Sequence, residues 1–244
     1  MEKLAEEIGE EQANLDNFND TRKEILGKME TVKFKSKMEE KEFHLMCLKR
    51  MIIAEKQLTS RLPILARKRD IFRLIDEHSL IILEGETGSG KSTQLPQMLC
   101  EYYNIFGNPA ALPVLITQPR KLATRTLAER VAAEMEESVH SFVDYQASSN
   151  SAINEKAKIV FKLDRLVLDE LTVDPILSKY CCLVIDEAHE RTLSIDIILG
   201  LIKNLLQKRK DFKIIVTSAS MDTQLFKKYF ETKILKVSGR VYPV

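Results

Sequence analysis

The sequence predicts an α/β fold, in which a mostly parallel sheet carries helices on both faces and is preceded by an α-helical extension. From about residue 61 onwards, short apolar runs of strand length alternate with amphipathic helical segments, as in a parallel sheet covered on both faces. Polar segments follow directly after several of these runs. The first 60 residues lack this alternation and have a helical apolar pattern instead.

The composition is that of a domain with a sizeable core. The 244 residues are 44% hydrophobic with a formal net charge of +1, so bulk charge does not point to a nucleic-acid partner. The 4 cysteines form no Cys-x-x-Cys pair and the 4 histidines are scattered, so we expect reduced thiols, no structural metal site and an intracellular protein of the nucleus or cytoplasm. No apolar stretch reaches the roughly 18 residues that span a membrane, and we expect no membrane partner.

Residues 1–60 are expected to form a helix or a helical hairpin. They contain no proline, and their apolar residues follow an imperfect heptad register. Residues 1–20 hold seven acids and one base, whereas residues 21–60 hold ten bases and six acids. Two interpretations stay open: a coiled-coil element that self-associates or binds a protein partner, and a solvated helix.

The remaining elements follow in order. Residues 61–79 predict a turn and a helix. Strands are expected at 80–83, 114–118, 158–163, 181–186, 213–219 and 234–237, and helices at 91–103, 121–137, 164–172, 193–209 and about 222–230. Because ligands bind beyond the carboxyl ends of parallel strands, the polar segments after these strands should converge at one edge of the sheet.

The stretch Gly85–Ser92 has the spacing G-x-x-x-x-G-K-[ST] of a phosphate-binding loop. Its glycines permit positive φ, so that backbone N–H groups can turn around an anion at a helix N-terminus. Lys91 is expected to reach the β- and γ-phosphates and Ser92 to ligate Mg²⁺; a chance glycine-rich turn is the alternative. The expected nucleotide contacts are Gly85, Glu86, Thr87, Gly88, Ser89, Gly90, Lys91, Ser92 and Thr93.

The segment CCLVIDEAHER (181–191) places two carboxylates at the end of an apolar strand. Asp186 is expected to hold Mg²⁺ directly or through water, and Glu187 to polarise the attacking water as general base. His189 is expected to pass the nucleotide state to neighbouring elements. The alternative is a strand that ends in acids at a helix N-terminus, which a phosphate loop upstream disfavours.

Together these residues resemble the DEAH-box helicases of superfamily 2. The resemblance extends over about residues 61–244 and implies a RecA-like domain that binds ATP and Mg²⁺ and contacts RNA. Further segments that carry it are TQPRKLATRTLAERVA (117–132), ERTLSIDIILGLIK (190–203), VTSASMD (216–222) and GRVYPV (239–244).

The resemblance also implies roles for single residues. Arg130 matches the arginine that stacks on the base, and Arg120 and Lys121 match positions that touch the RNA backbone without reading sequence. Ser218, Ala219 and Ser220 stand where the family usually has Ser-Ala-Thr, a segment expected to couple nucleotide and RNA binding.

Two segments depart from the family pattern. Residues 144–148 lack the glycine and arginine of the usual Gly-Tyr-x-Ile-Arg, and Leu163-Asp164-Arg165 replaces the usual Thr-Asp-Gly. We therefore expect nucleotide binding to be retained and RNA contacts to be altered. Arg165 could supply a substitute phosphate contact, so the direction of the change stays open.

We expect a helical extension over residues 1–60 and a RecA-like ATP-binding domain over 61–244, without the second RecA-like domain that supplies arginine fingers. Alone, such a chain should bind ATP–Mg²⁺ and hydrolyse it slowly. The leading interpretation is the motor domain of an ATP-dependent RNA helicase. The alternatives are a degenerate helicase that acts as an ATP-dependent binding or scaffold protein, and a DNA helicase or other P-loop ATPase.

Overall fold

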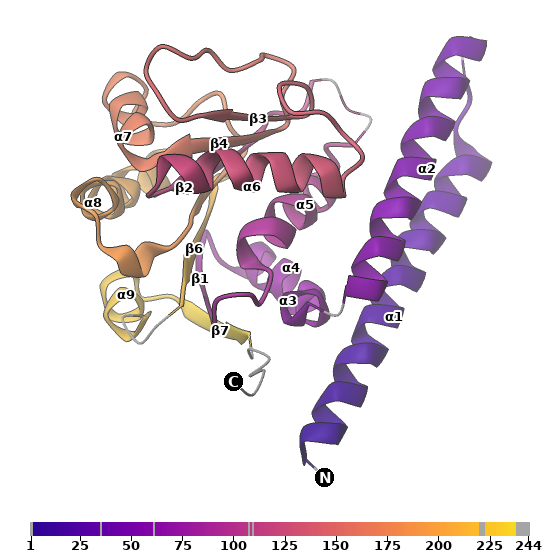
Figure 1. Ribbon diagram of the computed structural model, residues 1–244, viewed down its shortest axis with the longest axis horizontal. Helices are drawn as coiled ribbons and strands as arrows, with labels where there is room; N and C mark the ends of the chain where they lie inside the picture. Colours follow the sequence, from indigo (N-terminus) through magenta and orange to yellow (C-terminus); the bar gives the residue numbers. More distant parts are fainter. Residues whose placement is uncertain are drawn as a thin grey trace.

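A seven-stranded parallel sheet forms the centre of the computed structural model, which describes residues 2–34, 36–60, 62–106, 108, 110–219 and 223–237 (Figure 1). The strand order is β3-β4-β2-β5-β6-β1-β7, and each neighbouring pair is parallel. This confirms the predicted α/β fold. The strands are β1 (Leu80–Gly85), β2 (Val114–Gln118), β3 (Val143–Gln146), β4 (Ile159–Leu163), β5 (Cys182–Ile185), β6 (Lys213–Ser218) and β7 (Lys233–Val237).

Helices cover both faces of the sheet, as the alternation of apolar runs predicts. One face carries α3 (Pro63–Ala66), α4 (Lys68–Glu77), α5 (Lys91–Tyr102) and α6 (Lys121–Glu134); the other carries α7 (Asp164–Val173), α8 (Leu193–Lys208) and α9 (Thr223–Phe230). Successive side chains of a strand point to opposite faces. The protein has one apolar cluster between the sheet and helices α3–α6 and another between the sheet and helices α7–α9. Accordingly, Ile81 and Leu83 of β1 belong to the first apolar cluster, whereas Leu80 and Ile82 belong to the second.

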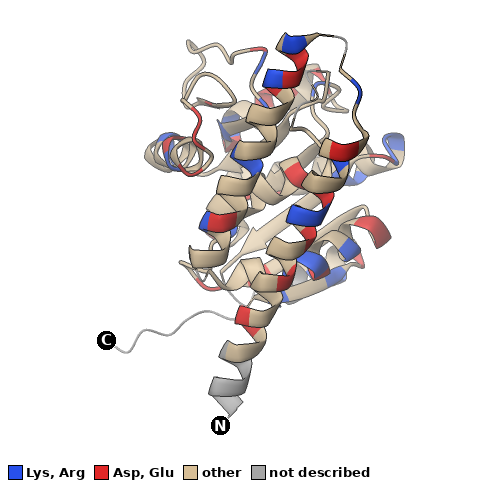
Figure 2. Cartoon of the chain, turned by 90° about the vertical axis from the view of Figure 1, so that its right-hand side faces the viewer, with Lys and Arg blue, Asp and Glu red and all other residues tan. Residues whose placement is uncertain are grey.

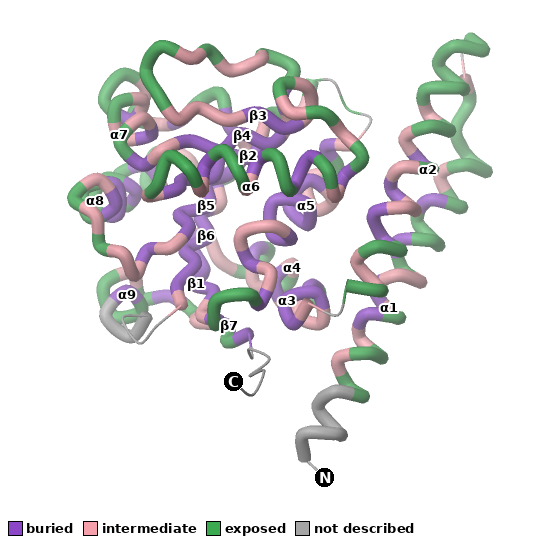
Figure 3. Tube along the Cα trace, viewed as in Figure 1, coloured by how far each residue is buried: buried purple, intermediate pink, exposed green. Residues whose placement is uncertain are grey.

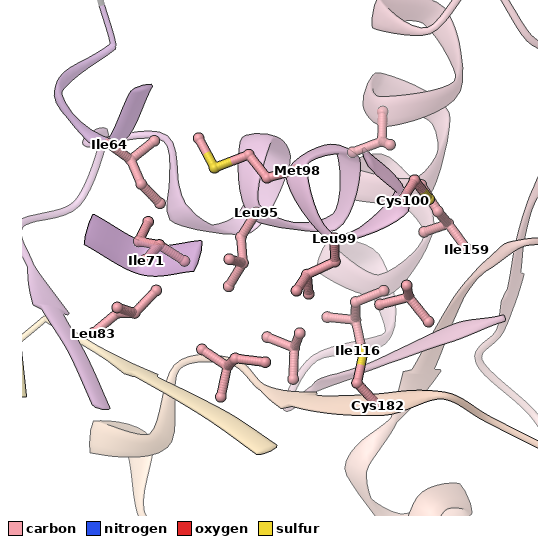
Figure 4. Packing of buried hydrophobic residues seen from close by; sticks show 14 of the residues in the cluster. Ile64, Ile71, Leu83, Leu95, Met98, Leu99, Cys100, Ile116, Ile159 and Cys182 are labelled. Carbon is pink, nitrogen blue, oxygen red and sulfur yellow. The ribbon is translucent and has the colours of Figure 1, made fainter. Parts of the chain in front are cut away.

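The first apolar cluster fixes the helix that follows the phosphate loop. Leu95 and Leu99 of α5 are fully buried and point toward the sheet, where Ile116 of β2 and Cys182 of β5 lie (Figure 4). Leu95 and Leu99 are four residues apart, so their side chains lie on the same face of the helix. The packing therefore sets the position of the N-terminal end of α5, where the loop ends.

One strand was not expected from the sequence. β3 has only four residues, two of them polar, and pairs with β4 alone at the edge of the sheet. A short half-polar run lacks the continuous apolar pattern by which the central strands are recognised. The segment Asp144-Tyr145-Gln146, which differs from the family pattern, therefore lies in this edge strand.

The extension is a helical hairpin of α1 (Glu2–Thr31) and α2 (Lys37–Ser60), which confirms the expected helices. Figure 1 shows it lying along the side of the domain next to α3, α4 and α5. Acidic and basic residues are interspersed along both helices (Figure 2). The central strands are mostly buried, the edge strands β3 and β7 only in part, and the hairpin alternates between buried and exposed positions (Figure 3). No described helix is long and apolar enough to cross a bilayer.

The hairpin makes specific contacts with the sheet domain. Asn17 donates to the carbonyl of Leu65 at 2.9 Å, and Ile53 joins the apolar cluster beneath α5 and α6. Arg50 of α2 is buried and lies 5.8 Å from the centre of the Phe106 ring, and within the hairpin it forms a two-pronged pair with Glu24 of α1, with N–O distances of 3.2 and 2.9 Å. Division of the chain at residue 60 into two domains stays a prediction.

We expect Ile53→Ala to destabilise the sheet domain and the hairpin together. Truncation of a buried isoleucine costs about 2–5 kcal/mol, and Ile53 belongs to the cluster shared by both parts. Urea unfolding followed by circular dichroism measures the change. Leu48→Ala, at an exposed position of the same helix, is the control and should change the free energy of unfolding by less than about 0.5 kcal/mol. Loss of hairpin helicity with unchanged stability of the sheet domain would contradict the expectation.

Candidate functional site

Four neighbouring strands bring the predicted functional segments to one edge of the sheet. β2, β5, β6 and β1 are consecutive in the sheet order and parallel. Their carboxyl ends carry Gln118, Asp186, Ser218 and Gly85, respectively. The edge is therefore where the phosphate loop, the acidic pair and the Ser-Ala segment meet, as expected for an open parallel sheet.

The loop after β1 has the backbone of an anion cradle. Gly88 and Gly90 have φ angles of +84° and +93°, a region that side chains disfavour. A Cβ atom at Gly90 would also lie 3.0 Å from Cγ2 of Ile64. Both the positive φ angle and the lack of space for a Cβ atom therefore require glycine at position 90. The helix α5 begins at the next residue, with its N-terminal N–H groups facing the loop.

The loop closes around the ammonium group of Lys91. This residue is 5% exposed, and its Nζ donates to the carbonyls of Gly85 and Glu86, the latter at 2.8 Å, and to Oγ of Ser89 at 3.2 Å. Burial lowers the pKa of Lys91, and the negative charges of Asp186 and Glu187 oppose that shift. A buried cation beside the glycine turn and the N-terminus of α5 fits a polyphosphate.

Asp186 is fully buried just beyond β5. Its carboxylate accepts hydrogen bonds from Nε2 of Gln118, at the end of β2, and from Oγ1 of Thr217, on β6. The two flanking strands therefore orient it. Sequence reasoning missed Thr217 as a site residue; its only signal was a polar residue near the end of an otherwise apolar strand.

Glu187 and His189 link the acidic segment to the end of β6. Burial, and next the charge of Asp186, raise the pKa of Glu187. Nδ1 of His189 lies 3.4 Å from Oε2 of Glu187 and accepts the backbone N–H of Ala219 at 3.3 Å. Ser220, the third residue of the predicted coupling segment, lies outside the described residues.

The three basic residues predicted to contact RNA lie at the same sheet edge. Arg120 directly precedes α6, Lys121 is the first residue of α6, and Arg165 lies in the first turn of α7 after β4. All three are exposed, and β2 and β4 are adjacent strands. Arg120 pairs with Glu190 at 3.0 Å, which links it to the segment after Asp186.

Arg130 lies away from the strand ends, near the end of α6. Its Nε donates to Oε1 of Glu134 at 2.6 Å, and its side chain is 69% exposed. Because α6 packs beside α5, Arg130 belongs to the same side of the domain as the helix that follows the phosphate loop.

The buried carboxyl group of Asp164 connects the segment Leu163-Asp164-Arg165, which differs from the family pattern, with α8. Oδ2 of Asp164 accepts a hydrogen bond from Oγ1 of Thr192 at 3.2 Å, and Thr192 caps α8 by accepting from the N–H of Ile195 at 3.1 Å. Burial raises the pKa of Asp164 to about 6, although the hydrogen bond from Thr192 lowers this pKa. The segment Leu163-Asp164-Arg165 therefore retains a structural link to the acidic segment.

Comparison with known proteins shows the family. A DEAD/DEAH box helicase model matches residues 63–227, and the chain belongs to that family. It is 45% identical over 185 residues to the ATP-dependent RNA helicase HrpA homolog of Haemophilus influenzae, and 40% identical over 184 residues to ATP-dependent RNA helicase HrpA of Escherichia coli. It is 41% identical over 196 residues to the probable ATP-dependent RNA helicase DHX35 homolog of Caenorhabditis elegans.

Each of these alignments covers 75% of this chain. The chain spans only 14% of the two bacterial relatives and 26% of the nematode relative. It therefore matches one domain-sized part of much longer proteins.

Asp164→Asn should raise the melting temperature at pH 8 and give no gain below pH 4. A folded-state pKa near 6 against an ordinary value of 3.8 means that the folded state binds more protons between these values. Stability from this group therefore falls as pH rises through that window, by at most about 3 kcal/mol. An asparagine carries no charge and can still accept the Thr192 hydrogen bond.

Thermal unfolding at pH 4 and pH 8 measures this difference. Asp169→Asn, on an exposed position of the same helix, is the matched control and should show no pH-dependent gain. Equal destabilisation of Asp164→Asn at both pH values would contradict the raised pKa, since it would mean that the folded-state carboxyl has the same charge at pH 4 and pH 8.

Proposed function

We propose that this chain is the ATP-binding motor domain of a DEAH-box RNA helicase, which couples ATP hydrolysis to RNA or RNP remodelling when joined to a second RecA-like domain. The observation that carries the proposal is the closed phosphate loop around Lys91 after β1, with Asp186 and Glu187 after β5, the next strand but one in the sheet. The family match and the names of the relatives support it.

The residues of the loop fit a nucleoside triphosphate. Backbone N–H groups of Gly85–Thr93 and the N-terminus of α5 would hold the phosphates, and Lys91 would neutralise their charge. Ser92 and Asp186 would hold Mg²⁺, which supplies charge stabilisation during phosphoryl transfer. Hydrogen bonds from Gln118 and Thr217 hold the Asp186 carboxylate in one orientation for that task.

Glu187 is the residue we propose as general base. Its pKa is raised by burial, which moves a carboxylate toward the proton affinity that a base needs near neutral pH. His189 contacts both Glu187 and the backbone of Ala219. Through this contact, a change at the carboxylate would reach the segment Ser218-Ala219-Ser220, the proposed coupling element.

The RNA contacts are proposed at the basic residues Arg120, Lys121 and Arg165. They share one sheet edge, and cations in such a position bind phosphates without reading bases. Arg120 is already paired with Glu190, so binding of RNA there would exchange one anionic partner for another. The altered segment around Arg165 would change these contacts, because it lacks the usual hydroxyl at Leu163 and gains a cation at Arg165.

Residues 1–60 are proposed to bind another protein or a second copy of the chain. Exposed apolar side chains of the hairpin support this, among them Ile8, Leu15, Met38, Leu45 and Leu48. We also propose an intracellular location, in the nucleus or cytoplasm, since the relatives are named RNA helicases.

Glu187→Gln should lower ATP turnover of the protein that contains both RecA-like domains by about 10²-fold or more, because the amide cannot accept a proton. Binding of ATP–Mg²⁺ should persist, whereas Lys91→Ala should weaken it. Steady-state phosphate release and equilibrium nucleotide binding test these outcomes. Glu155→Gln, at an exposed loop position, is the control. Normal turnover in Glu187→Gln would remove this residue from the proposed role.

Combined substitution of Arg120, Lys121 and Arg165 by alanine should weaken RNA binding and reduce its salt dependence, since three phosphate contacts are lost. Filter binding with and without an ATP analogue, over a series of salt concentrations, measures this. The control is Lys208→Ala with Lys210→Ala, two exposed cations that precede β6 at the opposite edge. Competition with DNA of the same sequence tests the preference for RNA. Equal losses in both variants would mean that the sheet edge is not the RNA surface.

A further inference from the structure

Three side-chain donors from two helices converge on the carboxylate of Glu134, at the end of α6. Nε2 of Gln94 and Nε2 of Gln97 lie 2.7 and 2.8 Å from its Oε2. Nε of Arg130 lies 2.6 Å from its Oε1. Both glutamines belong to α5, the helix that starts at Lys91. One carboxylate therefore connects the helix of the phosphate loop to Arg130.

The burial of these side chains fixes the direction in which the carboxylate of Glu134 points. Gln94 and Gln97 are each 3% exposed, and the side chain of Glu134 is 20% exposed. The two buried amides hold one oxygen of Glu134, so the other oxygen points in a fixed direction. Arg130 is mostly exposed, and an exposed ion pair alone orders a side chain weakly. Here the acceptor is anchored from behind, which gives the guanidinium a defined position.

A second pair on α6 shows what the anchor adds. Arg125 donates to Glu129 at 2.7 Å with the same spacing of four residues. The side chain of Glu129 is 44% exposed, and that of Glu134 less than half as much. The helix thus presents two ion pairs of equal local geometry, of which the one at Glu134 is tied to α5.

We propose that Glu134 is a positioning residue for nucleotide recognition: it holds Arg130 against the base and joins that contact to the phosphate loop through Gln94 and Gln97. The inference rests on the proposed function, ATP binding by the phosphate loop, and on the expectation from the family resemblance that Arg130 stacks on the base. Phosphate binding at the N-terminus of α5 and base binding at α6 are then linked through one carboxylate. A ligand without a base does not use this link.

The test compares ATP with inorganic tripolyphosphate, each with Mg²⁺, in equilibrium binding to the chain. Glu134→Gln keeps the size of the side chain but replaces one acceptor oxygen by a donor. We expect it to weaken ATP binding roughly 3- to 10-fold and to leave tripolyphosphate binding unchanged. Glu129→Gln is the matched control and should change neither affinity.

A double-mutant cycle separates positioning from general support of the fold. In an Arg130→Ala background, Glu134→Gln should have no further effect on ATP affinity, because the positioned group is gone. Arg130→Ala is an exposed substitution and supplies a second arm: it alone should lower ATP affinity without lowering tripolyphosphate affinity. Thermal unfolding of each variant reports its fold.

Other outcomes overturn the inference. Equal weakening of ATP and tripolyphosphate by Glu134→Gln would make Glu134 a support of the loop only. Persistence of its effect in the Arg130→Ala background would exclude action through Arg130. Tripolyphosphate binding as tight as ATP binding in the unaltered chain would mean that no base contact exists. Failure of both ligands to bind would overturn the proposed function as well.

Discussion

A buried positive charge at the end of β1 is the interaction on which the site depends. A buried ammonium is tolerated only where oxygen atoms surround it, and Lys91 finds these in the carbonyls of Gly85 and Glu86 and the hydroxyl of Ser89. The loop can fold back over the Lys91 side chain because glycines occupy the positive-φ positions 88 and 90. The carboxylate of Asp186 adds charge from the next strand but one. Parallel pairing of four strands brings all of these groups to one place.

The same requirement recurs on the helical side of the domain, where buried polar groups are matched across elements. Lys68 of α4 pairs with Glu101 of α5 at 2.6 Å, and Thr21 of the hairpin contacts the same carboxylate at 3.3 Å. Lys49 of α2 reaches Glu137, just after α6, at 2.5 Å. The hairpin therefore touches α5 and the chain just after α6, and Lys56 of α2 lies 3.5 Å from the carbonyl oxygen of Glu134 itself. Matched charges at such points favour one arrangement of the helices over others, since a displaced helix would leave a charge unpaired.

The fold was largely predictable because its central strands are continuous apolar runs and its helices have clear periodicity. β3 escaped prediction because an edge strand of four residues is stabilised by pairing with β4 rather than by its own apolar pattern. The phosphate loop and the acidic segment were also evident, because their residues are adjacent in sequence. Thr217 and Glu134 were not, since each acts through a partner more than 30 residues away.

The sequence by itself determined the class of fold, the family resemblance and the local groups of the site: the glycines, Lys91, Asp186 and Glu187. These depend on short-range spacing and on strand hydrophobicity, which are visible along the chain. Only the tertiary structure decided which groups orient them. The strand order sets Gln118 and Thr217 on either side of Asp186, and the packing of α5 against α6 sets two glutamines behind Glu134. Such contacts arise from the relative placement of whole elements, which no local pattern encodes.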